Sequence, residues 1–380
     1  MSMTNSSISE GLLRALLLLA PCLVLMSVSG IAGLAEKTGR VYVYVSLGGE
    51  NKIALFEMNP QTGQLTSQRN IPLEGSPGSL AVDSTRKFLY AAIRSANSVA
   101  SFRIDPQTGG LDHLGTVPVV DNPVYVTPDK KGRFLLTSYY GGGKAAVYPI
   151  GKNGAVVGEA TAICSTDRNP HSIMVDPSNR FVYVPNTGAD KILQYAFNEQ
   201  TGALSLLSTP EVATASGTGP RHIFFHPTKN YVYFVNEKGS SVTGFHQDRM
   251  TGKLKEFQTI STLPSDFSDE NSCADVEITP NGKFLYASNR GHDSIAGYSI
   301  DLSTGRLTSL GQQPTEKTPR EFNIDPTGNY LYSAGESSGR MASYQINAST
   351  GQLKPLKIYD VGKVPSWVLL VSLPAPSAEQ

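Results

Sequence analysis

A glycine-containing turn signal recurs seven times along the chain at near-even spacing. The seven glycines lie 45 to 53 residues apart, and six of them belong to a Thr-Gly-x-Leu unit. They are Gly63, Gly109, Gly154, Gly202, Gly252, Gly305 and Gly351. A period of this length is too long for a leucine-rich repeat and suits a four-stranded propeller blade, provided that the repeat contains strands.

Short runs rich in β-branched and aromatic residues occur once per repeat, and no helical periodicity of apolar residues is sustained through them. Such runs are typical of β-strands. The predicted second strands of the blades are Val41–Val45, Phe88–Ala92, Phe134–Ser138, Phe181–Pro185, Tyr231–Val235, Phe284–Ser288 and Tyr330–Ala334. The sequence therefore predicts an all-β protein, a seven-bladed β-propeller.

The last six of these strands follow an apolar run and a Pro/Asn/Gly turn, which predicts an inner strand before each of them. The first blade has no such run in front of it. The segment Ser366–Ser372 is an apolar run with no second strand after it. We therefore expect this C-terminal strand to pair with the N-terminal blade, which closes the ring and removes an open sheet edge.

The blades account for nearly all of the 380 residues, so residues 36–380 are predicted to form one domain. The formal net charge is zero and no run of Lys or Arg stands out. This composition argues against binding to nucleic acid or to an anionic membrane surface. We expect a monomer.

The first 35 residues differ from the rest of the chain. Arg14 precedes an apolar run, Leu16–Met26, and small residues follow up to Ala35. This pattern predicts a signal peptide, residues 1–35, and an exported protein, periplasmic or secreted, with no stable membrane association after cleavage. An uncleaved anchor, or a cytoplasmic protein without a signal, is the alternative. Cys22 follows a proline, which disfavours a lipoprotein.

The two remaining cysteines, Cys164 and Cys273, fall in different predicted blades, so we expect two separate thiols. Neither has a neighbour at metal-ligand spacing. The sequence also lacks the Gly-x-Ser-x-Gly elbow of a serine nucleophile. No metal and no cofactor are expected.

In a propeller, the start of each inner strand and the end of each second strand open on the same face of the ring. The sequence places a ring of charged and polar residues there: His171, Arg221, His222, Asp275, Arg320, Glu321, Tyr139, Tyr140, Asn186, Asn236, Glu237, Asn289, Arg290 and Glu336. Three arginines, two histidines and several carboxylates around one channel mouth suit an anionic, oxygen-rich small molecule and include a candidate general acid or base. The alternative is an ordinary polar rim.

Strand alternation separates some neighbouring candidates. If Arg221 faces the mouth, then His222 is expected to turn into the stack of blades. His226 lies in a predicted turn on the opposite face, which favours a structural role, and Trp367 is expected in the core. Tyr139 and Tyr140 either stack on a substrate ring or are ordinary strand ends.

Three segments carry a resemblance to a known family. They are Gly217–Pro227 with Tyr231–Glu237, Asp266–Asp269 with Ile278–Gly282, and Gln313–Arg320. In order and in residues they resemble the bacterial propeller-type 6-phosphogluconolactonases, a family that also includes the carboxy-cis,cis-muconate cyclases. The resemblance covers blades two to seven. It implies a seven-bladed propeller, no metal requirement and hydrolysis of a sugar-acid lactone.

Residue by residue, the resemblance implies a catalytic set of His171, Arg221 and Glu237, with Arg290 and Arg320 binding the substrate. The substrate is then 6-phosphogluconolactone, an intermediate of the pentose phosphate pathway, or an unphosphorylated aldonolactone if the protein is exported. Two alternatives stay open: a noncatalytic exported propeller that serves as a binding platform, and a muconate-type cycloisomerase with the same residues.

Overall fold

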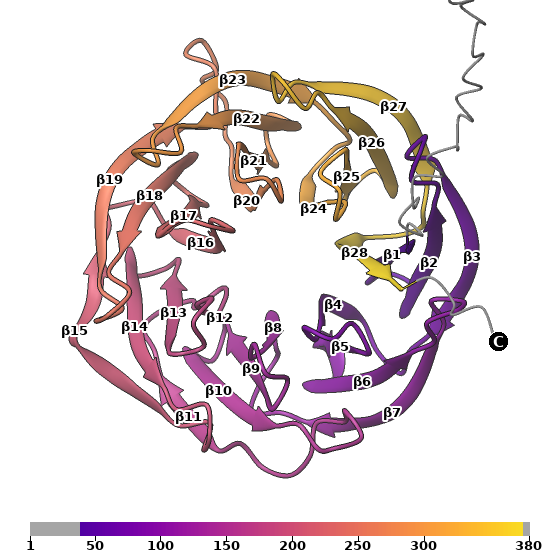
Figure 1. Cartoon of the computed structure of the whole chain (residues 1–380), viewed down its shortest axis with the longest axis vertical. Coiled ribbons are helices and arrows are strands. Elements are labelled where there is room, and N and C mark those ends of the chain that lie inside the picture. Colours follow the sequence, from indigo (N-terminus) through magenta and orange to yellow (C-terminus); the bar gives the residue numbers. More distant parts are fainter. Residues whose placement is uncertain (1–38, 375–380) are drawn as a thin grey trace, which may run out of the picture. The chain divides into compact units, whose positions relative to one another are not determined.

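The computed structural model describes residues 39–374, which form a ring of seven four-stranded antiparallel sheets around a central axis (Figure 1). The predicted seven-bladed β-propeller is confirmed. The predicted signal peptide, residues 1–35, lies outside the described residues. Among residues 39–374, no helix is long and apolar enough to cross a membrane.

Each blade has one strand at each of four distances from the axis. The innermost strands are β28 (Pro365–Leu373), β4 (Pro77–Val82), β8 (Tyr125–Pro128), β12 (Met174–Val175), β16 (Pro220–Phe225), β20 (Cys273–Ile278) and β24 (Pro319–Ile324). The second strands are β1 (Arg40–Leu47), β5 (Phe88–Ile93), β9 (Phe134–Tyr139), β13 (Phe181–Asn186), β17 (Tyr231–Asn236), β21 (Phe284–Asn289) and β25 (Tyr330–Gly335). All seven second strands lie where the sequence predicts them.

The outer half of each blade is regular as well. The third strands are β2 (Lys52–Met58), β6 (Ser98–Ile104), β10 (Lys144–Pro149), β14 (Lys191–Phe197), β18 (Ser241–Gln247), β22 (Ser294–Ile300) and β26 (Arg340–Ile346). The outermost strands are β3 (Leu65–Pro72), β7 (Leu111–Pro118), β11 (Ala162–Ser165), β15 (Leu204–Ala213), β19 (Leu254–Ser261), β23 (Leu307–Pro314) and β27 (Leu353–Asp360). One short 3-10 helix, η1 (Arg94–Ala96), follows β5.

The C-terminal strand closes the ring as expected. β28 pairs with β1 in an antiparallel register that sets Val43 opposite Leu370, and the first sheet has the order β28-β1-β2-β3. The first blade is therefore built from both ends of the described chain. Its inner and second strands have no unpaired edge between them, so the ring has no gap at which another chain could add a strand.

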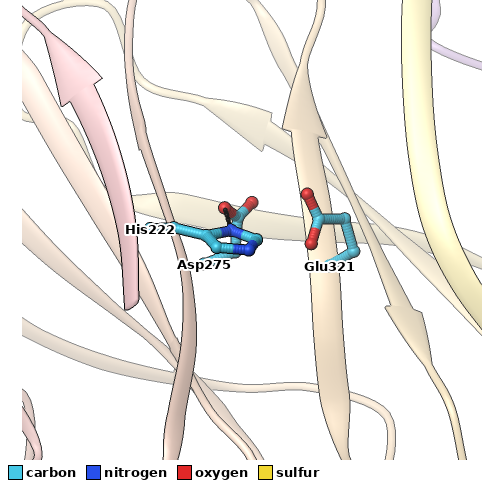
Figure 2. Close-up of side chains that lie close together, drawn as sticks. All are labelled: His222, Asp275 and Glu321. Carbon is cyan, nitrogen blue, oxygen red and sulfur yellow. Dashed lines mark hydrogen bonds and ion pairs between the residues drawn. The ribbon is translucent and has the colours of Figure 1, made fainter. Parts of the chain in front are cut away.

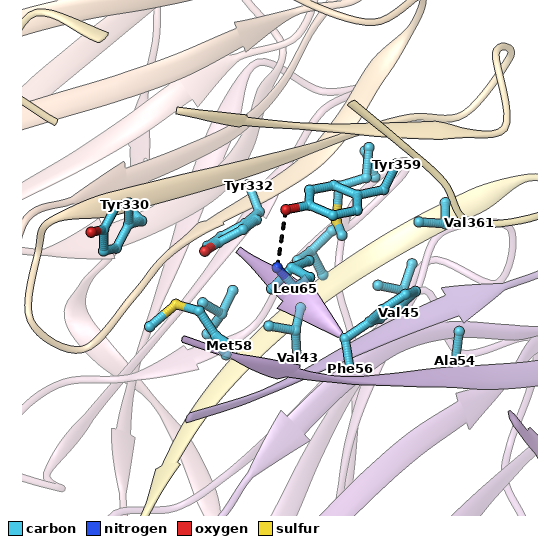
Figure 3. Packing of buried hydrophobic residues seen from close by; sticks show 14 of the residues in the cluster. Val43, Val45, Ala54, Phe56, Met58, Leu65, Tyr330, Tyr332, Tyr359 and Val361 are labelled. Carbon is cyan, nitrogen blue, oxygen red and sulfur yellow. Dashed lines mark hydrogen bonds between the residues drawn. The ribbon is translucent and has the colours of Figure 1, made fainter. Parts of the chain in front are cut away.

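The second strands are buried on both faces because each blade packs between two others. In β1, Val43 and Val45 pack with Tyr330 and Tyr332 of the last blade (Figure 3). Tyr44, between them in the strand, packs with residues of the second blade. Tyr359 accepts a hydrogen bond through its hydroxyl from the backbone N–H of Leu65, at 3.0 Å. Burial on both faces explains why these strands are continuous apolar runs.

The repeated Thr-Gly turn joins each blade to its neighbour. Gly63, in the hairpin between β2 and β3, has a φ of +67°, and an added Cβ would run into the ring of Tyr330 in the last blade. The next tyrosine along that strand, Tyr332, donates a hydrogen bond to the carbonyl of Gly63 at 2.6 Å. The other six hairpin glycines meet the first aromatic residue of a neighbouring second strand in the same way: Tyr42, Phe88, Phe134, Phe181, Tyr231 and Phe284.

His226 lies in the turn between the inner and second strands of the fifth blade, and the equivalent turn of the fourth blade explains its role. Asp176 accepts hydrogen bonds through one carboxylate oxygen from the backbone N–H groups of Arg180 and Phe181 at the corresponding turn of the fourth blade. In the fifth blade His226 holds the turn instead, because its Nδ1 accepts from the N–H groups of Thr228 and Lys229, at 3.2 and 3.1 Å. The predicted structural role of His226 is confirmed.

Candidate active site at the channel mouth

Residues at equivalent positions of the seven inner segments form three layers along the axis. The upper layer consists of the second residue of each inner segment: Gly78, Val124, His171, Arg221, Ala274, Arg320 and Ser366. The middle layer is Ser79, Tyr125, Ser172, His222, Asp275, Glu321 and Trp367. The lower layer is Ala81, Thr127, Met174, Phe224, Glu277, Asn323 and Leu369. The upper layer lies at the face where the second strands end.

A bulge near the start of the inner strands lets consecutive residues reach this region. In β16 the register passes from Pro220 opposite Asn236 to His222 opposite Val235, so Arg221 has no partner across the ladder. A bulge leaves one residue unpaired and redirects its side chain. The expectation that His222 turns into the stack of blades is therefore wrong: the structure places both Arg221 and His222 toward the axis. Strict alternation does not apply across a bulge.

Arg221, Glu237 and Arg290 form a linked trio at the mouth. Glu237 lies directly after β17, and its two carboxylate oxygens lie 3.0 Å from Arg221 Nε and 3.3 Å from Arg290 Nη2. Arg221 is 1% exposed and also donates through Nη1 to the carbonyl of Ala274. Burial, followed by the charges of Arg290 and Arg320, lowers the pKa of Arg221, yet a guanidinium stays protonated at neutral pH.

A second arginine pair lies further around the ring. Arg320 contacts Glu336, with 3.6 Å between Nη1 and Oε2. Arg94 directly follows the second strand β5. Glu237, Arg290 and Glu336 occupy the same position after the second strands of their blades. The charges of Arg320 and Glu336 both act on Arg94. Sequence reasoning missed Arg94, although its position at a strand end was a signal that could have found it.

Gly78 makes room for Arg94. A Cβ on Gly78 would come within 2.7 Å of Arg94 Cδ, so the upper layer of the second blade is occupied by an arginine side chain from the neighbouring strand. Arg94 Nε donates to Asn122 Oδ1 at 3.2 Å, which fixes its direction. The described mouth thus contains four arginines, Arg94 together with Arg221, Arg290 and Arg320, against the carboxylates of Glu237 and Glu336.

His171 lies beside this charged group. Its ring centroid is 5.2 Å from that of His222 and 5.5 Å from that of Tyr140. The residue is 6% exposed, and within residues 39–374 its Nδ1 is buried with no hydrogen-bond partner. Burial, with Arg221 as the next cause, holds the pKa of His171 well below its usual value. His171 is therefore neutral at physiological pH, and one of its two ring nitrogens carries a lone pair.

The two tyrosines at the end of β9 differ in role. Tyr139 is fully buried and exchanges hydrogen bonds with Thr137 and with Tyr148, at 2.6 and 3.0 Å, so it is part of the blade packing. Tyr140 is half-buried and stacks edge-on against His171. Of the two, only Tyr140 is in a position to contact a molecule bound at the mouth.

The middle layer contains a buried acidic cluster directly below Arg221. One side-chain nitrogen of His222 and one carboxylate oxygen each of Asp275 and Glu321 lie within 4.8 Å of one another (Figure 2). His222 Nδ1 is 2.9 Å from Asp275 Oδ1, and His222 Nε2 is 3.1 Å from Arg221 Nη1. Burial raises the pKa of Asp275 to about 7, and burial followed by the charge of Asp275 raises that of Glu321.

These three residue types can bind a divalent cation in other settings, but their contacts here are unfavourable for one. Both nitrogens of His222 already have partners, and the Arg221 guanidinium lies beside the cluster. A cation would have to displace a partner and approach a fixed positive charge.

Below the cluster, the axis holds a cavity of about 290 Å³. Its wall includes His222, Asp275, Glu277, Tyr125 and Trp367. Trp367 is half-buried and stacks edge-on against Tyr125, with ring centroids 5.5 Å apart. The sequence predicted Trp367 in the core. It packs against two core clusters and also lies on the wall of the axial cavity, because β28 is an inner strand.

Three further histidines lie outside the inner strands. They are His113, His246 and His292, which pack against Phe102, Phe257 and Phe267. Cys164 and Cys273 are both free, as expected.

Comparisons with known proteins place the chain in a family. The model of the family described as "Lactonase, 7-bladed beta-propeller" matches residues 29–128 and 116–370. The chain therefore belongs to the seven-bladed β-propeller lactonase family. Over 234 residues it is 37% identical to 6-phosphogluconolactonase of Pectobacterium carotovorum, and the aligned segment covers 62% of this chain and 70% of the relative. With the Klebsiella pneumoniae 6-phosphogluconolactonase, identity is 34% over 282 residues, 74% of this chain and 70% of the relative.

A solved structure shows the same fold. The periplasmic gluconolactonase PpgL of Pseudomonas aeruginosa superposes with a TM-score of 0.82, covering 88% of this chain and 100% of the other, at 23% sequence identity. The likeness supports the ring architecture alone.

Proposed function

We propose that the protein hydrolyses a sugar-acid lactone at the channel mouth. The observation that carries this proposal is a neutral, buried histidine with an unpartnered ring nitrogen, His171, beside the linked arginines Arg221 and Arg290. Membership of the lactonase family and relatives named 6-phosphogluconolactonase support the same reaction class. Neither a binding platform nor a cycloisomerase is favoured by these relatives.

The arginines supply what ester hydrolysis needs most, which is stabilisation of the developing oxyanion. Glu237 holds the guanidinium groups of Arg221 and Arg290 on either side of one carboxylate. Their remaining N–H groups are donors for the lactone carbonyl oxygen as it gains negative charge. Fixed donors in a buried site stabilise such a transition state without reorganising, and the loss of one typically costs about a hundredfold or more in rate.

His171 is the group best suited to activate water. It accepts a proton from the attacking water as the new C–O bond forms, and it returns that proton to the ring oxygen when the lactone C–O bond breaks. Glu237 is less suited to this role, because both of its oxygens already contact arginines. We therefore assign Glu237 to positioning the arginines and His171 to proton transfer, with Arg290 and Arg320 binding the anionic parts of the substrate.

The charge at the mouth bears on substrate choice. Four arginines face two carboxylates in this region, so the excess charge is positive. This excess favours an anionic lactone such as 6-phosphogluconolactone. Export, which we propose from the Leu16–Met26 pattern, points instead to an unphosphorylated aldonolactone, since phosphorylated sugars are concentrated in the cytosol. N-terminal sequencing of the protein from cell fractions tests export: a mature chain starting near Glu36 outside the cytoplasm supports it, and an intact cytoplasmic chain contradicts it.

A comparison of two substrates tests the function and its charge preference together. We expect hydrolysis of both 6-phosphogluconolactone and gluconolactone above the spontaneous rate, with a higher kcat/KM for the phosphorylated compound. In the Arg94→Met protein this preference should fall by about tenfold, the effect of roughly 1.4 kcal/mol from one charge-assisted hydrogen bond. The exposed Arg103 provides a matched control, Arg103→Met. No hydrolysis of either lactone would contradict the proposed function.

A further inference from the structure

A continuous chain of contacts runs downward from the proposed catalytic arginine into the axis. Glu237 contacts Arg221, Arg221 contacts His222 Nε2 at 3.1 Å, and His222 Nδ1 contacts Asp275 at 2.9 Å. Glu321 lies next to Asp275 (Figure 2). Each of His222, Asp275 and Glu321 is at least nine-tenths buried. The proposed roles of Arg221 and His171 leave these three residues without a function.

The hydrogen atoms of this chain can be assigned from chemistry alone. A guanidinium has only donors, so Arg221 Nη1 donates and His222 Nε2 accepts. A neutral imidazole then carries its proton on Nδ1, which donates to Asp275 Oδ1. Burial and the charge of Arg221 hold the pKa of His222 well below its usual value, which agrees with a neutral ring. Asp275 thus determines which tautomer of His222 faces Arg221.

Two buried oxygens of the cluster have no partner. Asp275 Oδ2 and Glu321 Oε2 make no hydrogen bond to any of the residues 39–374. Two neighbouring ionised carboxylates would repel each other strongly in a buried setting, whereas one proton between them gives each group a partner. The cation alternative is weaker, because both nitrogens of His222 are occupied and Arg221 is adjacent.

The charged and titratable groups that face Asp275 come from four strands. They are Arg221 and His222 of β16, Glu277 of β20, Glu321 of β24 and Tyr125 of β8. Arg290 and Arg320 act on His222, and Arg320 also acts on Glu321. Glu277 has a separate partner, since Asn323 Nδ2 donates to it at 2.9 Å. The strongest neighbours of Asp275 within the cluster are therefore Glu321 and His222.

We propose that Asp275 and Glu321 share one proton and that Asp275, acting through His222, is a positioning residue that holds Arg221 in place for lactone hydrolysis. The inference rests on the proposed function for its effect on the rate, but the proton arrangement is independent of it. When the shared proton is lost, a second negative charge appears beneath Arg221. This charge weakens the attraction of the site for an anionic substrate, so KM rises while folding is retained.

The Asp275→Asn protein tests the arrangement. An asparagine amide can donate to His222 Nδ1 and so favours the tautomer that presents N–H to Arg221, where two donors oppose each other. We expect kcat/KM for 6-phosphogluconolactone to fall about 10- to 100-fold, the usual range for a residue that orients a functional group. His222→Gln should recover most of the activity lost in His222→Leu, because a glutamine can accept from Arg221 and donate to Asp275. Asp112→Asn, on the exposed β7, is the matched control.

The pH profile adds a readout that a packing role would not change. In the wild-type protein kcat/KM should decrease at alkaline pH, where the shared proton is lost, mainly through KM. Glu321→Gln should remove this decrease, because a single carboxylate next to an amide has no proton to share. An unchanged profile in Glu321→Gln would overturn the shared proton, and equal loss in His222→Gln and His222→Leu would overturn the positioning role.

Two measurements keep the test independent of lactonase activity. Imidazole ¹⁵N NMR should show His222 as the Nδ1–H tautomer in the wild-type protein and as the Nε2–H tautomer in Asp275→Asn. Elemental analysis should find no stoichiometric metal in the purified protein. A divalent ion that is bound in the wild-type protein and lost in Asp275→Asn would overturn the shared proton and indicate a cation site instead. If the wild-type protein hydrolyses neither lactone, the proposed function fails while the tautomer result still decides this inference.

Discussion

Arg221 is the residue on which the proposed chemistry most depends. It has contacts in three directions: Glu237 beside it, the Ala274 carbonyl, and His222 below. A planar guanidinium can satisfy such divergent partners and still direct N–H groups at a substrate, whereas an ammonium on a flexible stem cannot. The position therefore requires arginine itself and not only a positive charge.

The Arg221→Lys protein should separate charge from geometry. We expect kcat/KM for lactone hydrolysis to fall at least about a hundredfold, because the fixed donors for the oxyanion are lost although the charge remains. Steady-state kinetics on protein with a native circular dichroism spectrum is the measurement. Arg306→Lys, at an exposed hairpin, should retain wild-type kinetics. Activity within a few-fold of wild type in Arg221→Lys would remove Arg221 from the mechanism.

The blades are held to one another by their hairpins. The carbonyl of Gly252 accepts a hydrogen bond from the hydroxyl of Tyr183 in the preceding blade. The backbone of Gly252 has a φ of +74°, and an added Cβ would run into the ring of Phe181. The glycine is required twice, once for the backbone conformation and once for the close approach of the aromatic ring. The period visible in the sequence is therefore the period of contacts between blades.

Gly252→Ala should show both costs. We expect the free energy of unfolding to fall by about 2–5 kcal/mol, from about 1–2 kcal/mol of backbone strain and about 1–3 kcal/mol of crowding against Phe181. Gly158 has a similar φ of +68° with no atom within 4 Å of an added Cβ. Gly158→Ala should therefore cost only the strain, about 1–2 kcal/mol. Equal effects of the two substitutions in urea unfolding would contradict the role of the hairpin contact.

The inner strands show where sequence reasoning reaches its limit. The rhythm of strands and turns was sufficient to predict the ring, its closure by β28, and the face on which His171, Arg221 and Glu237 gather. The side-chain direction of His222 was not predictable, because the bulge at Pro220 is a property of the pairing with β17 and not of β16 alone. The proton arrangement of Asp275 and Glu321 depends on a distance between two different blades, which no single repeat specifies.

The ring carries a cluster of buried ionisable groups at its centre, so its stability should depend on pH. Burial lowers the pKa values of His171 and His222 in the folded protein. A lowered histidine pKa contributes stability that is present above the unfolded value of about 6.5 and is lost as the pH falls below it, because the unfolded chain then binds protons that the folded chain excludes.

From pH 7 to pH 5, His171 should lower the free energy of unfolding by up to about 2 kcal/mol. The buried carboxyl groups of Asp275, Glu277 and Glu321, whose pKa values are raised by burial, act in the opposite direction over this interval. In His171→Gln this share should disappear, so stability at pH 5 relative to pH 7 should rise by up to about 2 kcal/mol compared with the wild-type protein. His113 is exposed, and His113→Gln should leave the slope unchanged. Urea unfolding at the two pH values is the measurement, and an equal slope in the wild-type and His171→Gln proteins would contradict a buried neutral His171.

Hydrolysis of a lactone by His171 at the channel mouth is tested most directly by one assay. The purified protein and its His171→Ala variant are compared in a pH-indicator assay of acid release from 6-phosphogluconolactone and gluconolactone, with spontaneous hydrolysis subtracted. We predict that the wild-type protein hydrolyses at least one lactone and that His171→Ala lowers kcat about a hundredfold or more, as for loss of a general base. Equal rates in the two proteins would contradict the assignment of His171 and with it the proposed active site.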